Sequence, residues 1–515
     1  MTTTTPLVPR RHLCMFAMLV SCFALWGGLN TMTENLVPAF QRIFAMDQSR
    51  AGLVQVAFYG AYGVLAVFAS VLTREFSCRV GVLVGLAVYV LGALLYVPAC
   101  LAQSFDVYFV AVFVVAAGCS LLETTCNPYV LLLGDERTAV RRLNFAQAFN
   151  PLGSMAGIFL ARSVILAHLH PATTVERAAM DPAVLREIVH AELFWVCVPY
   201  VGICALACGI WFFFLRFGAD GDAVAGEKGE GGRAGALRRG GLALAFALVP
   251  LAVLYALFPQ MDKVRWILLG MLGPLAYLLA VPSYRAQLRT LLGRPRYWGG
   301  VAAQFFYVGA QIAVWTWLNV YCQKMLGVGP KTAALYYVAA MALFIGCRWI
   351  ATALMKYVSP ARLLAAFAAG AAACCLGAMY LPSSGGFAVG ALRFPPNVLC
   401  LVATSGFMSL MFPTIYGIAL GGLDPQAFKL GTAGLIMSIL GGAIVTPWMG
   451  GVLGARDSAW FALVRGADAA WDANLLTSDL GLRASFAIPA VCFLAVLVYA
   501  LACGRAAGGG RGARA

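Results

Sequence analysis

A single acidic residue interrupts one of the long uncharged runs of this chain. Glu123 lies in the segment LLETTCNPYVLLLG, which covers residues 121–134. A carboxyl group in apolar surroundings can bind and release a proton, and its oxygens accept hydrogen bonds from hydroxyl groups. A packing role does not require an acid, so Glu123 is the first candidate for chemistry.

Amide and aromatic side chains follow helical spacing in three other segments. Asn144, Gln147 and Asn150 are three residues apart, which places them on one stripe of a helix. Two further stripes consist of Trp26, Asn30 and Glu34, and of Gln304, Tyr307, Gln311 and Trp315. Amides offer paired donors and acceptors to sugar hydroxyls, and an aromatic ring suits the C–H face of a sugar. The alternative is structural: amides often bond only neighbouring helices in membranes, and Tyr and Trp often pack or anchor at the interface.

The composition indicates the elements that position these side chains. With 62% hydrophobic and only 11% charged residues among 515, the chain differs from water-soluble domains, which are near half apolar and a quarter charged. Apolar runs of the ~20 residues needed to cross the hydrocarbon recur along the whole chain. Because a bilayer provides no water to bond the backbone, these runs are predicted to be helices. The sequence therefore predicts an all-α polytopic membrane protein.

The runs fall into two sets of six with a pair between them, about 14 transmembrane helices in all. The first set is 13–44, 51–73, 79–102, 105–133, 138–166 and 192–216; the pair is 242–258 and 264–283; the second set is 299–325, 331–356, 361–381, 397–421, 428–453 and 484–503. The stretch 218–241 is rich in glycine and charged residues, which indicates a linker. We therefore expect a bundle at 1–216, a cytoplasmic linker with two extra helices at 217–297, and a second bundle at 298–515.

The net charge of +15 is distributed in short loops between apolar runs and forms no basic face. It predicts topology rather than nucleic-acid binding, because Lys and Arg accumulate in cytoplasmic loops. Under the count above, both termini are expected in the cytoplasm and the protein in the cytoplasmic (inner) membrane. The N-terminal apolar run continues without a small-residue cleavage site, so it is interpreted as the first span rather than a signal peptide.

The sequence contains no motif for disulfide pairing, nucleotide binding, metal binding or nucleophilic catalysis. Most of the 16 cysteines lie singly in apolar runs and are interpreted as small buried hydrophobes. No nucleotide loop of the GxxxxGK[ST] type, metal-ligand cluster or nucleophile constellation is present. The sequence thus predicts no enzyme, no cofactor and no ATP-driven pump.

The two sets of six resemble each other weakly. PYVLLLGD after the fourth span corresponds to PTIYGIALGGLD after the tenth, and FNPLGSMAG in the fifth parallels MSILGGAIV in the eleventh. Repeated six-helix halves are the architecture of transporters that rock two bundles around a midplane site.

Several segments are similar to the fucose permease and the related glucose/galactose permeases of the major facilitator superfamily. The resemblance covers all twelve core spans and rests on FALWGGLN, VQVAFYGAYG, LETTCNPYVLLLGDERTAVRRLNFAQAFNPLGSMAG, AQFFYVGAQ, FPTIYGIAL and LGGAIVTPWMGG. It implies a monosaccharide importer of the fucose, galactose or glucose type, usually driven by protons, and a substrate and proton role for Glu123. Arg348 matches an arginine of the fucose permease and is expected to have a structural or gating role.

We therefore expect substrate contacts from a set of seven residues: Asn30, Glu123, Gln147, Asn150, Tyr307, Gln311 and Trp315. Glu123 and Glu34 are the candidates for proton coupling. The expected partners are a monosaccharide, a proton or sodium ion and membrane lipid, with no nucleic acid, and the expected oligomeric state is a monomer.

Two features depart from the family pattern. The relatives carry an aspartate directly after the first-span asparagine, whereas here that position is Thr31, and a threonine hydroxyl does not titrate in this range. The second departure is the inserted pair 242–283, which can be a plain spacer. Thr31 keeps sodium coupling and facilitated diffusion open as alternatives to proton symport. A multidrug or other small-molecule exporter on the same fold is a further alternative, although it would favour a greasier cavity with fewer amides.

Overall fold

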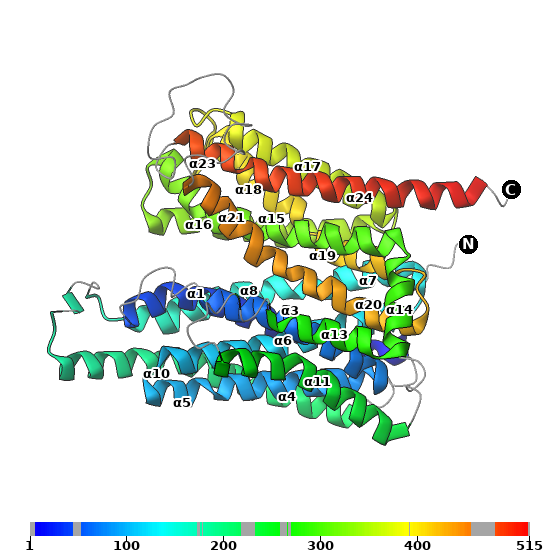
Figure 1. Cartoon of the computed structure of the whole chain (residues 1–515). Coiled ribbons are helices and arrows are strands. Elements are labelled where there is room, and N and C mark those ends of the chain that lie inside the picture. The colour runs from blue at the N-terminus through cyan, green and yellow to red at the C-terminus, as the bar shows by residue number, and fades with distance from the viewer. Residues whose placement is uncertain are drawn as a thin grey trace. The chain divides into compact units, whose positions relative to one another are not determined.

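The computed structural model describes residues 6–44, 53–172, 176–177, 179–217, 232–257, 265, 269–390, 392–454 and 479–512. Within these ranges the chain is built almost entirely of helices, as the composition predicts, with one two-stranded antiparallel hairpin of β1 (Phe387–Val389) and β2 (Leu392–Phe394). Among the residues that the structure describes, thirteen helical segments are long and apolar enough to cross a membrane. The protein is therefore an all-α polytopic membrane protein (Figure 1).

The helices form two compact units. Unit 1 comprises residues 1–294 and 422–437, and unit 2 comprises residues 295–421 and 438–515. Residues 422–437, which the sequence analysis placed in the second bundle, cluster with unit 1.

Unit 1 contains the first six spans, the inserted segment and one helix from late in the chain. Its helices are η1 (Arg10–His12), α1 (Leu13–Ile43), α3 (Leu53–Glu75), α4 (Cys78–Leu94), α5 (Tyr96–Ala102), α6 (Phe105–Leu132), α7 (Glu136–Gln147), α8 (Phe149–Leu160), η2 (Ala161–Ile165), η3 (Leu166–His168), α10 (Pro182–Phe217), α11 (Gly232–Leu257), α13 (Leu272–Ala280), α14 (Pro282–Leu292) and α20 (Pro425–Met437).

Unit 2 contains the remaining spans and the hairpin. Its helices are α15 (Pro295–Leu326), α16 (Pro330–Leu354), α17 (Pro360–Tyr380), α18 (Pro396–Met408), α19 (Met411–Leu420), η5 (Ser438–Leu440), α21 (Gly441–Gly454), α23 (Asp479–Ser485) and α24 (Ala487–Gly512). Four successive helices, α15 to α18, begin with proline. Proline suits a first helical position because its missing N–H would have had no partner in the helix. In Figure 1, α17 and α24 lie side by side.

Close glycine contacts join corresponding spans within each unit. In unit 1 a Cβ on Gly153 of α8 would lie 1.9 Å from the carbonyl oxygen of Ala24 in α1. In unit 2 a Cβ on Gly441 of α21 would lie 2.1 Å from the carbonyl oxygen of Phe305 in α15. Small residues let membrane helices approach to backbone contact. The parallel segments FNPLGSMAG and MSILGGAIV therefore have the same packing task in the two units.

The inserted segment packs on α3. A Cβ on Gly273 in α13 would lie 2.0 Å from the carbonyl oxygen of Phe246, so α11 and α13 are in close contact. Gly63 of α3 faces Met271, whose sulfur would be 2.8 Å from an added Cβ. Many apolar side chains of α11 are exposed, with Leu257 at 67%, which suits a helix facing lipid. The sequence prediction of a second inserted span at 264–283 falls partly outside the described residues; its described part includes the short helices α13 and α14, which meet at Val281.

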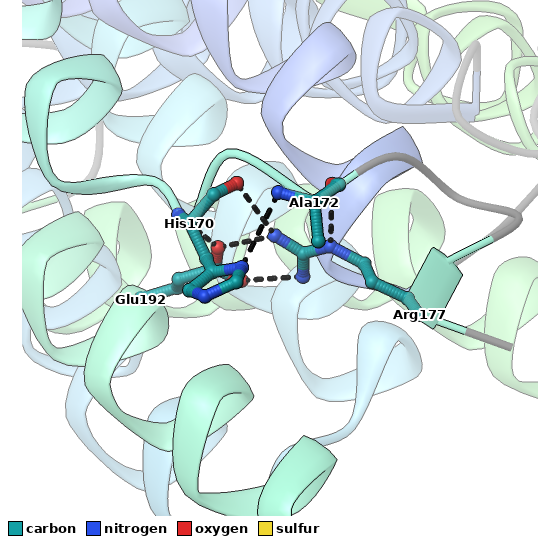
Figure 2. A network of polar contacts seen from close by, with 4 residues as sticks. All are labelled: His170, Ala172, Arg177 and Glu192. Atoms are coloured by element: carbon teal, nitrogen blue, oxygen red, sulfur yellow. Dashed lines mark hydrogen bonds and ion pairs between the residues drawn. The ribbon is translucent and has the colours of Figure 1, made fainter. Parts of the chain in front are cut away.

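A buried ion pair fixes the connection before α10. The Arg177 guanidinium bonds both carboxylate oxygens of Glu192, and the two side chains are 1% and 2% exposed. Arg177 also donates to the backbone carbonyls of His170 and Ala172, while the His170 N–H donates to Glu192 (Figure 2). The Glu192 carboxylate and the Arg177 guanidinium in Figure 2 therefore both have partners, and the cluster holds His170, Ala172 and Arg177 against α10.

Candidate transport site

Glu123 lies in the interior of the 28-residue helix α6 and is 8% exposed. The hydroxyl of Tyr62 on α3 lies near this carboxyl group, and the Asn30 amide of α1 lies near that hydroxyl. Tyr62 Oη and Asn30 Oδ1 are buried without a hydrogen-bond partner among the described residues. Three helices of unit 1 therefore bring an acid, a phenol and an amide together. Such a group can exchange hydrogen bonds with a polyhydroxylated ligand and can bind a proton at the carboxyl group.

A pair of amides extends this cluster by one helical turn. Asn127 follows Glu123 by four residues and therefore shares its face of α6. The Gln147 Nε2 donates to Asn127 Oδ1 at 2.8 Å, and both side chains are buried. Asn127 Nδ2 has no hydrogen-bond partner among the described residues. A buried donor without a protein partner is suited to a ligand oxygen.

Two other amides of the fifth span bond backbone. Asn150 Nδ2 donates to the carbonyl oxygen of Phe23 in α1 at 3.3 Å, and Asn144 donates within its own helix to Val140 at 3.0 Å. Asn150 also lies where α8 touches α1, because its carbonyl oxygen would be 2.2 Å from a Cβ on Gly27. In this arrangement Asn150 contributes to helix packing, the structural alternative that the sequence left open.

The first-span position at which the family resemblance leads us to expect an acid contributes no charge. Thr31 is buried, and its hydroxyl donates to the Gly27 carbonyl one turn earlier in α1 at 3.1 Å. The side chain of Glu34, the second candidate for proton coupling, lies outside the described part of the structure. Glu123 is consequently the candidate acid whose surroundings are defined.

In unit 2 the polar side chains of α15 and α16 meet a broken span. The tenth span, 396–420, is interrupted between α18 and α19 at Ser409 and Leu410. The Tyr307 hydroxyl donates to the Met408 carbonyl at 3.1 Å, and Arg348 Nε donates to the Ser409 carbonyl at 2.5 Å. Carbonyls that a helix break releases inside a membrane need new partners, and these two side chains provide them.

Trp315 belongs to the same region of unit 2. Its indole N–H donates to Ser405 Oγ in α18 at 3.2 Å, and its ring packs edge-on against Phe344 at 5.3 Å. Gln304, on the stripe of Tyr307 and Trp315, is fully buried, and its amide atoms have no hydrogen-bond partner among the described residues. Gln311 is half-buried on the same helix. The α15 stripe therefore combines groups that support the break with amides that can still accept a ligand.

The structure adds two residues that the sequence analysis did not select. Tyr62 was present in the quoted segment VQVAFYGAYG, but nothing in its spacing indicated that it faces Glu123 on another helix. Asn127 could have been found, since it is four residues after Glu123 and must lie on the same face. Among the described residues, no group of three or more His, Cys, Asp or Glu side chains could hold a metal ion, and each of the 16 cysteines is a free thiol.

The chain is similar in sequence to several transporters over almost its whole length. The chain is 33% identical to the L-fucose-proton symporter of Haemophilus influenzae, covering 95% of this chain and 96% of the relative. It is 31% identical to the L-fucose-proton symporter of Escherichia coli, covering 95% and 93%. It is also 26% identical to a glucose/galactose transporter of Brucella abortus, covering 93% and 91%.

A solved structure supports the same family assignment. The structure resembles the crystal structure of the major facilitator superfamily transporter FucP in the outward conformation with a TM-score of 0.71 and 28% identity, covering 96% of this chain and 99% of that one. The family model described as Major Facilitator Superfamily matches residues 13–446. These matches agree with the helical fold. The chain therefore belongs to the major facilitator superfamily and is a transporter rather than an enzyme.

Proposed function

We propose that this protein imports a monosaccharide of the fucose, galactose or glucose type by alternating access, coupled to protons. The observation that carries the proposal is the buried cluster of Glu123, Tyr62 and Asn30, extended by Asn127 and Gln147. An acid in the interior of a membrane helix is costly, so such residues usually carry function. The names of the relatives, L-fucose-proton symporters and glucose/galactose transporters, support the same substrate class and coupling.

The coupling role is assigned to Glu123. Proton symport requires a group that is protonated on one side of the membrane and deprotonated on the other. Desolvation disfavours the charged form of a carboxyl group, so access of water can switch its protonation. The Thr31 hydroxyl cannot bind and release a proton in this way. Glu123 is therefore the proposed proton carrier, and Glu34 is the second candidate.

The sugar contacts are assigned to both units. In unit 1 they are Asn30, Glu123, Gln147 and Asn150, and in unit 2 they are Tyr307, Gln311 and Trp315. Asn150 bonds a backbone carbonyl that it would exchange for a sugar hydroxyl. The Tyr307 hydroxyl can keep donating to the Met408 carbonyl and accept a hydrogen bond from the sugar. Discrimination between hexoses depends on the placement of donors against hydroxyl groups, because an unpaired buried polar group is strongly disfavoured.

We place the protein in the cytoplasmic membrane with both termini in the cytoplasm, because the Lys and Arg of its short loops fall on one side under the span count and such loops are usually cytoplasmic. The proposed oligomeric state is a monomer. The proposed domains are the bundle 1–216, the linker and inserted helices 217–297, and the bundle 298–515. Membrane lipid is the surrounding partner.

The test is uptake by the purified protein in proteoliposomes. Radiolabelled L-fucose, D-galactose and D-glucose are supplied with an inward proton gradient, an inward sodium gradient or no gradient. We expect one of these sugars to accumulate with the proton gradient and the accumulation to collapse with a protonophore. Uptake that ignores the pH gradient at every accessible pH would contradict proton coupling, and no uptake of any of the three sugars would contradict the substrate class.

A further inference from the structure

A buried cluster ties the inserted segment to the end of α3. Glu75 is the last residue of α3, and its side chain is 3% exposed. Its Oε2 accepts a hydrogen bond from Arg239 Nε of α11 at 2.7 Å. Its Oε1 accepts one from the Tyr284 hydroxyl of α14 at 2.8 Å. Both partners come from the region 217–297, so both carboxylate oxygens of Glu75 are bonded by the insertion.

The same cluster reaches α20. Arg74, next to Glu75 in α3, donates from Nε to Gln426 Oε1 of α20 at 2.8 Å. Its guanidinium carbon lies 4.4 Å from the centre of the Tyr284 ring, a cation–π geometry. Tyr284 thus bonds Glu75 through its hydroxyl and positions Arg74 with its ring. α14 also packs directly on α20, and α20 packs on α3.

The electrostatics require the carboxylate. Arg74 is 9% exposed and Lys429 of α20 is 3% exposed. Arg74 directly precedes Glu75 in the chain, and the Glu75 carboxylate acts electrostatically on Lys429. Buried cations are retained only where they are paired or bonded. Burial, together with the hydrogen bond to Glu75, raises the pKa of Tyr284, so its hydroxyl stays protonated and donates to the carboxylate.

A spacer between two bundles does not need these contacts. A linker needs only to span the distance between the two bundles, and an exposed polar chain can span it without buried charges. A buried ion pair adds little net stability and is better attested as a device that selects one arrangement. The arrangement selected here is the contact between the end of α3 and α20. In a transporter that alternates between two states, contacts between helix ends form in one state and break in the other.

We propose that the inserted helices α11, α13 and α14 are a conformational clamp that keeps the end of α3 bonded to α20 and so slows the opening of the protein at that end. The proposal rests on alternating access as the transport mechanism. Arg239 and Tyr284 hold Glu75, and Tyr284 holds Arg74 against Gln426. Loss of the clamp should increase the population in which α20 has left α3.

A native thiol reports on this opening. Cys78, the first residue of α4, is fully buried and lies within electrostatic range of Lys429 on α20. Separation of α20 from α3 should admit a membrane-permeant maleimide to Cys78. Alkylation at each cysteine can be followed by peptide mass spectrometry of the full-length protein in proteoliposomes. Cys375 of α17 is also fully buried and monitors general loosening.

The decisive variants are Arg239→Met and its matched control Arg238→Met, because Arg238 is the exposed neighbour on the same helix. We expect Arg239→Met to speed alkylation of Cys78 about fivefold, the ratio for a loss of ~1 kcal/mol. Arg238→Met should leave the rate unchanged, and Cys375 should react at the same rate in all three proteins. Equal Cys78 rates in the two arginine variants, or a parallel rise at Cys375, would overturn the clamp.

Tyr284→Phe provides a second test that keeps the ring beneath Arg74 and removes only the hydroxyl bond. A smaller acceleration than in Arg239→Met is expected, and an unchanged Cys78 rate in both variants would overturn the proposal. These measurements contain no sugar and no gradient. The alkylation rates therefore test the clamp alone, and the uptake assay tests the proposed function alone. Either proposal can fail while the other is supported.

Discussion

The two units use buried polar side chains for different purposes. Around Glu123 in unit 1, Tyr62 lies near the carboxyl group and Gln147 bonds Asn127, so these contacts join side chains of different helices. In unit 2, Tyr307 and Arg348 bond the carbonyls of Met408 and Ser409 at the interruption of the tenth span. One unit therefore offers a group that titrates, and the other supports a broken helix.

This difference predicts which changes affect coupling and which affect stability. Side chains that bond each other can be exchanged for ligand groups without opening the backbone. Side chains that satisfy a helix break cannot be removed without leaving buried carbonyls unpaired, which costs ~1–3 kcal/mol each. The two halves therefore share similar sequence segments, but the buried polar clusters at Glu123 and at the helix break have different roles.

The largest effect is expected from Glu123→Gln. The amide keeps the size and hydrogen bonding of the carboxyl group but cannot carry a proton, so accumulation should fall to the level of empty vesicles, while exchange of sugar across the membrane continues. Accumulation is measured by radiolabelled uptake with an imposed pH gradient. The matched control is Glu192→Gln, which removes another buried carboxylate of unit 1 and should lower Tm without abolishing accumulation. Normal accumulation by Glu123→Gln would assign Glu123 a structural role.

Next in size is the loss of support at the helix break. Arg348→Met should lower the free energy of unfolding by ~1–3 kcal/mol, because the Ser409 carbonyl loses its donor. Tyr307→Phe should cost less, ~0.6–1 kcal/mol, as is common for hydrogen bonds between membrane helices. Both are measured as shifts of Tm in detergent. If neither variant lowers Tm while both abolish proton coupling, the contrast between the units is wrong.

A smaller and more selective effect is expected from Gln147→Ala. Removal of the amide deletes its bond to Asn127 and its proposed sugar contact, so KM for the transported sugar should rise about tenfold with coupling retained. Asn144→Ala is the matched control, since its amide donates within its own helix, and its KM should remain near that of the native protein. Equal KM values for the two variants would remove Gln147 from the site.

The smallest effect is expected from Glu34→Gln. If Glu123 suffices for coupling, this variant should transport normally and Thr31→Asp should shift the pH dependence of uptake, because it adds a second titrating acid to α1. If Glu34 has replaced the missing acid, Glu34→Gln should exchange sugar but no longer accumulate it. The ratio of exchange to net uptake distinguishes the two cases.

The sequence by itself determined the helical membrane fold and most of the spans, and it singled out Glu123 as the candidate for chemistry. These follow from local properties: an apolar run of sufficient length must form a helix in hydrocarbon, and an acid within such a run is costly wherever the run packs. Thr31 was likewise visible as a departure, because titration depends on residue type. The second inserted span was less well defined, since α13 and α14 meet at Val281 rather than continuing as one helix.

Only the tertiary structure decided which polar side chains meet. Tyr62 reaches Glu123 from another helix, Tyr307 and Arg348 bond the carbonyls of a break, and Glu75 is bonded by residues of an insertion far along the chain. Helical periodicity fixes the face on which a residue lies, but the partner depends on how each helix is rotated and how closely it approaches its neighbours. Glycine contacts such as that of Gly153 with Ala24 set this approach, and they form only when residues distant in sequence pack together.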